Sequence, residues 1–157
     1  MGMQYDVKSQ HAGASGLMVG YRVRLKGAVI FPFTGATGYT TLVDNTSIVG
    51  TFTRTTTTAT VTAPAHGLRT GMWTYLDWAL ASNPYQVTVV DANTFTVTVA
   101  NSGAASGAVT VWPDVLLQLD ASNQTAYSVP IPGEGVLAQN GIRIFLAADM
   151  HATVFYG

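Results

Sequence analysis

The chain has 157 residues, of which 48% are hydrophobic and only 10% are charged, and its formal net charge is −1. Soluble domains usually carry roughly 25% charged residues, so much of this surface must consist of small polar and apolar side chains. The near-zero charge argues against a specific nucleic-acid partner and against a polybasic membrane patch. The lack of cysteine excludes a disulfide framework and thiolate metal sites.

This length suits one domain or two small ones. A chain with few charges and many strands risks edge-to-edge association, and burial against other subunits is one way to avoid it. The composition therefore favours a homo-oligomeric assembly component over a free monomer. Residues 1–10 are polar and mixed in charge, and no run approaches the roughly 20 apolar residues that span a bilayer. We expect no signal peptide, no membrane partner and folding in the cytoplasm.

The first segment, Met3 to Gly16, is polar and rich in Gly, Ala and Ser. This composition is typical of an arm that becomes ordered only when something docks on it. If the chain assembles, the arm is an expected contact, and Tyr5 and Lys8 are its candidate interface residues.

The first clear strand is predicted between Gly20 and Phe33. Apolar and basic residues alternate at its start, so Arg22, Arg24 and Lys26 should share the face opposite to the core. This stripe is either a solvated face that discourages strand pairing or a patch that meets an acidic neighbour or a phosphate backbone. Gly27 interrupts the pattern and predicts a β-bulge.

The middle of the chain, residues 53–112, has its own pattern, in which apolar residues alternate with threonines. Period-two alternation predicts strands with one buried face. We expect five short strands, with a loop through 82–84 and a hairpin across Asp91–Asn93. Five short strands in about sixty residues favour a small closed barrel.

The flanks, residues 1–52 and 113–157, read as two halves of another β domain. In the second half, strands are expected over 114–119, 126–131, 141–146 and 153–157. Prolines in the run Pro130 to Gly135 fix φ and remove donors, so this run should be a rigid corner. The predicted fold is all-β: a β-sandwich, jelly-roll-like, with an inserted small β-barrel.

No catalytic constellation emerges from the residues. The three histidines, His11, His66 and His151, are far apart in sequence and have no metal-ligand spacing. Glu134, the only glutamate, lies between two glycines, either to accept local N–H bonds or to meet a partner. We therefore predict no enzyme activity, no catalytic or metal residues and no cofactor.

Three aromatic residues offer one alternative site. Trp73, Trp78 and Tyr85 lie close together in sequence. They either belong to the barrel core or line a sugar-binding face, which would make the chain a carbohydrate-binding module.

The middle segment resembles a small β-barrel family that recurs as an insert in phage structural proteins. The matching residues are Ala63-Pro-Ala-His-Gly-Leu68, then Gly71, then Tyr85 to Phe95, within 59–111. The family takes its name from the first catalytic-cysteine half-domain of the ubiquitin-activating enzyme. The resemblance implies a non-enzymatic module.

The flanks resemble a family of small virion proteins of tailed phages. The matching motifs are Asp6-Val-Lys-Ser9, Arg22-x-Arg-Leu-Lys-Gly27, Ile131-Pro-Gly-Glu-Gly-Val136 and Val154-Phe-Tyr-Gly157. The resemblance implies that the barrel fills a gap between two strands that most relatives join directly. It also implies a capsid cement (decoration) protein in the virion, with a neck or tail component as the alternative. The expected partners are the major capsid protein or other virion proteins, and the expected interface includes Arg22, Arg24, Lys26 and Glu134.

Overall fold

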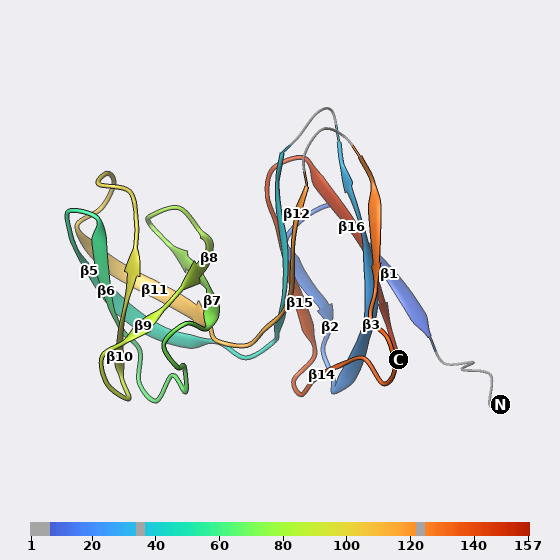
Figure 1. The fold of residues 1–157 in the computed structure, drawn as a ribbon, viewed down its shortest axis with the longest axis horizontal. Coiled ribbons are helices and arrows are strands. Elements are labelled where there is room, and N and C mark those ends of the chain that lie inside the picture. Colours follow the sequence, from blue (N-terminus) through green and yellow to red (C-terminus); the bar gives the residue numbers. More distant parts are fainter. Residues whose placement is uncertain (1–6, 34–36, 122–124) are drawn as a thin grey trace. The chain divides into compact units, whose positions relative to one another are not determined.

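The structure is a computed structural model that describes residues 7–33, 37–121 and 125–157. Within these residues the chain is all-β, with sixteen strands and no helix. It divides into two compact units, one comprising Met1–Asn45 with Leu116–Gly157 and the other Thr46–Val115 (Figure 1). The second unit is thus continuous in sequence and interrupts the first.

The first unit contains two antiparallel sheets. The five-stranded sheet has the order β1-β16-β3-β13, with β14 also paired to β3, and the four-stranded sheet has the order β12-β4-β15-β2. The strands are β1 (Lys8–Ala12), β2 (Gly16–Val19), β3 (Val23–Pro32), β4 (Gly38–Asp44), β12 (Val115–Ala121), β13 (Tyr127–Pro130), β14 (Val136–Ala138), β15 (Ile142–Leu146) and β16 (Met150–Tyr156).

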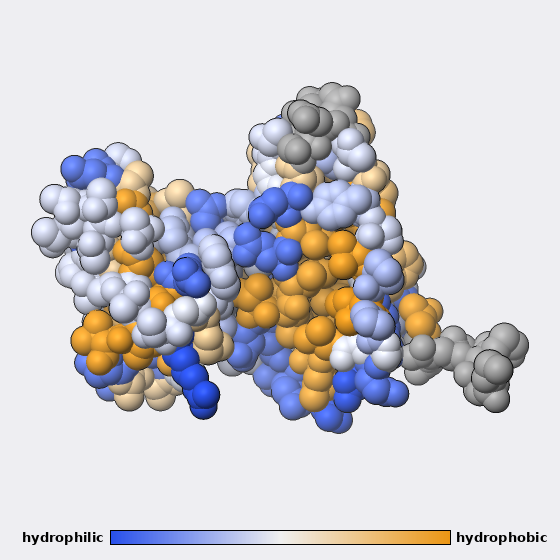
Figure 2. All heavy atoms as spheres, in the orientation of Figure 1, coloured by the Kyte–Doolittle hydropathy of each residue, from blue (hydrophilic) through white to orange (hydrophobic). Residues whose placement is uncertain are grey.

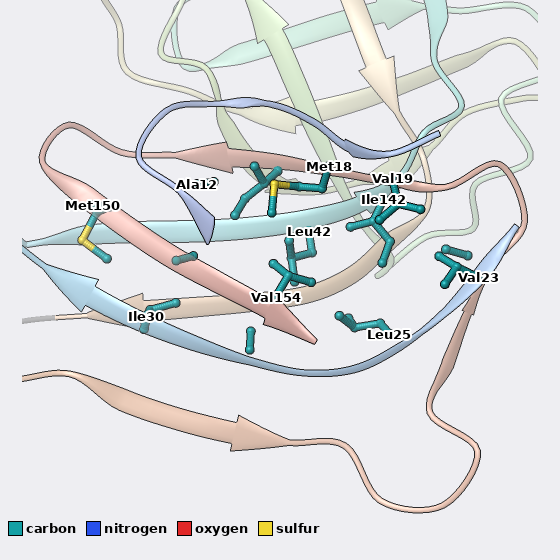
Figure 3. Close-up of a cluster of buried hydrophobic side chains, with 14 of the residues drawn as sticks. Ala12, Met18, Val19, Val23, Leu25, Ile30, Leu42, Ile142, Met150 and Val154 are labelled. Carbon is teal, nitrogen blue, oxygen red and sulfur yellow. The ribbon is translucent and has the colours of Figure 1, made fainter. Parts of the chain in front are cut away.

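Both sheets contribute side chains to one hydrophobic core, so the unit is sandwich-like (Figure 3). Leu25 and Ile30 of β3 are fully buried in it, as are Leu42 of β4 and Ile142 of β15. Burying a side chain of this size stabilises the fold by about 1.5–3 kcal/mol. The core therefore ties strands from both ends of the chain into one unit.

The irregularity expected at Gly27 is present in β3. The register against β16 shifts so that Phe155 pairs with Gly27 and Tyr156 pairs with Leu25, which leaves Lys26 as an extra residue. Because one extra residue reverses the side-chain alternation, the buried residues change from odd positions before the bulge to even positions after it.

The segment predicted as a free arm is partly built into the fold. Lys8–Ala12 pairs with β16 over its whole length, and Ala12 is buried in the core. Gly16 already belongs to β2. Residues 3–6, including Tyr5, lie outside the described residues. The prediction of an arm is therefore wrong for residues 8–12 and 16, because backbone pairing with the last strand orders them.

The second unit is one seven-stranded antiparallel sheet, ordered β8-β7-β11-β5-β6-β10-β9, which nearly closes into a barrel. β8, at one end of the sheet, lies close to β10 near the other end. The strands are β5 (Ile48–Thr55), β6 (Thr58–Thr62), β7 (Trp73–Trp78), β8 (Asn83–Gln86), β9 (Thr88–Val89), β10 (Thr94–Thr98) and β11 (Ser106–Trp112). Residues 83–84, predicted as a loop, begin β8, and residues 48–52, predicted in the flanks, belong to this sheet.

The alternation of threonines with apolar residues predicted this sheet correctly. Ala59 and Val61 of β6 face the same core as Phe95 and Val97 of β10, while the intervening threonines face outward. The hairpin across Asp91–Asn93 is also present, because β9 and β10 pair directly on either side of it. This unit has a core of its own.

Candidate functional site

The basic stripe, Arg22 before β3 with Arg24 and Lys26 on it, contacts another segment of the same chain. Nη1 of Arg24 donates to the carbonyl oxygen of Gly135 at 3.3 Å, and Nζ of Lys26 donates to that of Glu134 at 3.0 Å. Nε of Arg22 donates to Oε1 of Gln139 at 3.1 Å. The three cations therefore hold one segment, residues 134–139, against β3. The expected stripe and the expected loop form one surface.

The loop that carries Glu134 requires its two glycines. Gly133 and Gly135 have φ angles of 66° and 76°, in the left-handed region that L side chains rarely adopt. A Cβ atom on Gly135 would lie 2.3 Å from the carbonyl oxygen of Leu25. This close approach brings the Glu134 carbonyl within reach of Lys26, while the Glu134 residue itself is exposed.

An open groove of about 460 Å³ lies beside this surface. Lys26 and Gly27 line it. The other lining residues are Val7, Ser128, Val129, Pro130, Ile131, Gly133 and Phe155. Lys8, the remaining described interface candidate, is exposed on the edge strand β1.

Tyr127 of β13 has a clearly raised pKa. Its hydroxyl donates to the carbonyl oxygen of Asp120. Burial of the phenol, and secondly the negative charge of Asp120, raise its pKa above the ordinary value of 10.0. The neutral phenol therefore joins the ends of β12 and β13.

The three aromatic residues considered for sugar binding do not form one exposed face. Trp78 is only 8% exposed and packs edge-on against Phe52 at 4.9 Å in the barrel core. Its Nε1 donates to the carbonyl oxygen of Ala81 at 3.0 Å, and the hydroxyl of Tyr85 donates to the same oxygen at 2.6 Å. Both polar groups are therefore engaged within the barrel.

The strand register explains why the three aromatic side chains do not share one face. Trp73 pairs with Gln86, and Thr74 pairs with Tyr85, so Trp73 and Tyr85 start from opposite faces of the sheet. Trp73 alone is well exposed, at 47%. It borders an open groove of about 500 Å³, which Tyr85 also lines, together with Thr70, Gly71, Pro84, Gln86, Val87, Thr88 and Thr98. A stacking platform that includes Trp78 is not formed.

His66 is buried, and both of its ring nitrogens are engaged with the backbone. The N–H of Leu68 donates to Nδ1 at 3.0 Å. Nε2 lies 3.1 Å from the carbonyl oxygen of Asp91, which can only accept. The ring is therefore the neutral Nε2–H tautomer, and it joins the turn at 66–68 to the β9–β10 hairpin. This arrangement leaves no lone pair for a metal.

The other two histidines are neighbours, which the sequence did not predict. His11 on β1 and His151 on β16 lie in stacked orientation with ring centroids 5.6 Å apart. The histidines are far apart in sequence and lack metal-ligand spacing, and this spacing gave no sign of the contact between His11 and His151. Pairing of the first strand with the last brings them together, and only that strand pairing could have signalled it.

The described residues contain neither a larger metal-ligand cluster nor a helix that could cross a membrane. No group of three or more His, Asp or Glu side chains is placed to hold a metal ion among them. In the same part of the chain, no helix has the length and hydropathy to cross a membrane.

The sequence was compared with protein families and with curated proteins. No family model matches the chain. A search of curated proteins also found no similar sequence.

Proposed function

We propose that this chain is a structural protein of a tailed-phage virion, most specifically a capsid cement or decoration protein. In this proposal the first unit is a jelly-roll-like β-sandwich that makes the assembly contacts, and the second unit is the inserted barrel module. The sequence motifs supply the family resemblance. Two of them, residues 22–27 and 131–136, are in direct contact through Arg24 and Lys26.

The observation that carries the proposal is the unprotected edge strand β12. Natural proteins protect sheet edges with charged residues, prolines or short strands. β1 begins with Lys8, β13 ends with Pro130, and β2 has only four residues. β12 is also at a sheet end, but it has seven residues and its one charge, Asp120, comes near its end.

The side chains of β12 strengthen this argument. The strand reads Val-Leu-Leu-Gln-Leu over residues 115–119, and each of these residues is only half-buried. Because alternate residues of a strand face opposite sides, aliphatic groups occur on both faces of this edge. A long edge strand with few charges is a site where a neighbouring chain adds a strand or packs its own apolar surface.

A cement protein acts through repetition of such contacts. Each copy covers its apolar edge against a capsid subunit or a second copy, and the contact recurs under the symmetry of the shell. Modest contacts then give strong binding, because several are made at once. The low charge of the chain suits a surface that is covered in the assembled particle.

The test is a charge placed in the middle of β12. Gln118→Lys should weaken self-association, or binding to cement-free capsids, by at least about tenfold, since it would place an ammonium group beside the apolar side chains of the contact and desolvate it. Ser9→Lys is the matched control, because β1 already carries Lys8 at its edge. Analytical ultracentrifugation and co-sedimentation with capsids provide the measurements.

The position of the chain in the particle distinguishes a cement protein from a neck or tail component. Antibody labelling of the particle should decorate the head lattice if the chain is a cement protein. Label confined to a ring at the neck or tail would instead favour the alternative virion component. A wild-type chain that stays monomeric at high concentration and binds no virion part would contradict the proposal.

A further inference from the structure

The histidine pair lies on the outer face of the five-stranded sheet. His11 pairs directly with Thr153, so His151 is its diagonal neighbour, two residues along β16 on the same face. Ala12 and Ala152 point into the core, which directs both histidines away from it. Nε2 of His11 lies 3.4 Å from Nδ1 of His151.

This separation matches the spacing of two metal ligands. Imidazole nitrogens bind Zn²⁺ at about 2.0–2.1 Å in tetrahedral geometry, which places two such nitrogens about 3.3–3.4 Å apart. The two rings therefore need little movement to direct both lone pairs at one ion.

Thr153 can orient His11 as a metal ligand through a hydrogen bond. Its Oγ1 lies 3.3 Å from Nδ1 of His11. When Nδ1–H donates to this hydroxyl, the lone pair of His11 is on Nε2, the nitrogen that faces His151. Metal-binding histidines are commonly oriented in this way, through a hydrogen bond made by the other ring nitrogen.

The surroundings leave room for the His151 ring and hold it in place. A Cβ atom on Gly13 would lie 2.9 Å from Cε1 of His151 and 3.1 Å from its Nδ1, so an alanine at position 13 would force the ring to shift. Phe33 packs against His151 at 5.6 Å, and Phe31 packs against His11 at 6.1 Å, both between ring centroids. The pair is thus restrained from several sides although His11 is exposed.

We propose that His11 and His151 form a binding site for a divalent transition-metal ion, with water in the remaining positions. Imidazole favours Cu²⁺, Ni²⁺ and Zn²⁺ over Mg²⁺ and Ca²⁺, which prefer oxygen ligands. No third His, Asp or Glu joins the pair among the described residues, so this part of the chain supplies two ligands. The site is independent of the virion proposal.

The test is a titration of the full chain with Cu²⁺, Ni²⁺, Zn²⁺ and Mg²⁺ by isothermal calorimetry. One saturable site is expected for the first three ions, strongest for Cu²⁺, and none for Mg²⁺. His11→Gln and His151→Gln should each abolish it, and Thr153→Val should weaken it by about tenfold. Gly13→Ala should also weaken binding, because it displaces the His151 ring.

NMR of the imidazole groups locates the bound ion. The resonances of His11 and His151 should shift or broaden on metal addition, whereas those of His66 should not, because both of its nitrogens are engaged. Thermal unfolding without metal checks that the variants fold, and the exposed position of His11 makes His11→Gln the safer one. Absence of saturable binding, or equal binding by the His11→Gln/His151→Gln double variant, would overturn the proposal.

Discussion

The three histidines show how local surroundings decide the role of one residue type. His66 is buried and bonded at both nitrogens, so it connects two turns. His11 and His151 lie on an outer sheet face, where one nitrogen of each ring faces the other ring. Only the second arrangement leaves lone pairs that can converge on a ligand. Sequence spacing does not distinguish these situations.

Tyr127 makes a prediction at the same scale for high pH. Its pKa is raised in the folded chain, so the folded state keeps the phenolic proton more tightly than the unfolded state does. Its contribution to stability is therefore complete below pH 10 and is lost as the pH rises through the folded-state pKa. We expect the stability difference between wild type and Tyr127→Phe to shrink above about pH 10.

Urea unfolding at a series of pH values measures this difference. Wild type and Tyr127→Phe share every other ionisable group, so the comparison isolates Tyr127. A difference that stays constant, or that grows with pH, would show that the Tyr127 proton is not held by the fold.

At the scale of elements, Arg54 near the end of β5 makes hydrogen bonds to the loop that connects β10 and β11. Its guanidinium donates to the carbonyl oxygens of Ala104 and Gly103 at 3.2 and 3.0 Å, and to Oδ1 of Asn101 at 2.9 Å. It also donates to the carbonyl oxygen of Thr56 at 2.8 Å. A planar group with several fixed donors is needed to reach all four acceptors at once.

Arg54→Lys should therefore destabilise the barrel by about 1–2 kcal/mol, because an ammonium group cannot reproduce this fork. Hydrogen exchange should become faster in residues 99–106 before it does so elsewhere in the unit. Arg69→Lys makes the same chemical change at an exposed residue and should leave stability within about 0.5 kcal/mol of wild type. Equal effects of the two substitutions would rule out a specific role for the Arg54 contacts.

The elements that sequence predicted well are those with a single clear pattern. Alternation in residues 58–62 and 94–98 fixed both the strands and their buried faces, and Gly27 marked the bulge in β3. β8 was missed because Pro84, which disfavours a central strand, is tolerated at the end of a sheet.

The candidate sites were harder to predict, because they depend on register and on distant pairing. β7 reads Trp-Thr-Tyr-Leu-Asp-Trp and is apolar on both faces, so only its pairing with β8 and β11 decides that Trp73 faces outward and Trp78 inward. The His11–His151 contact requires the first strand to pair with the last. Neither arrangement leaves a local signal in the sequence.

At the scale of the whole molecule, the two separate cores determine which unit a core substitution destabilises. Ile30 belongs to the core of the first unit and Phe95 to that of the second, and both are fully buried. Truncation of such residues costs about 2–5 kcal/mol for Ile→Ala and about 3–5 kcal/mol for Phe→Ala. Because the two residues belong to different cores, each substitution should lower the stability of its own unit and leave that of the other unchanged.

We therefore expect Phe95→Ala to speed hydrogen exchange in residues 46–115 while residues 7–33 and 125–157 keep wild-type protection. Ile30→Ala should give the converse pattern in the same full-length chain. Exchange followed by mass spectrometry resolves the two units, and calorimetry should show one transition displaced while the other stays in place. If either substitution lowered protection throughout the chain, the two cores would have to unfold as one cooperative unit, and the barrel could not be a self-contained insertion.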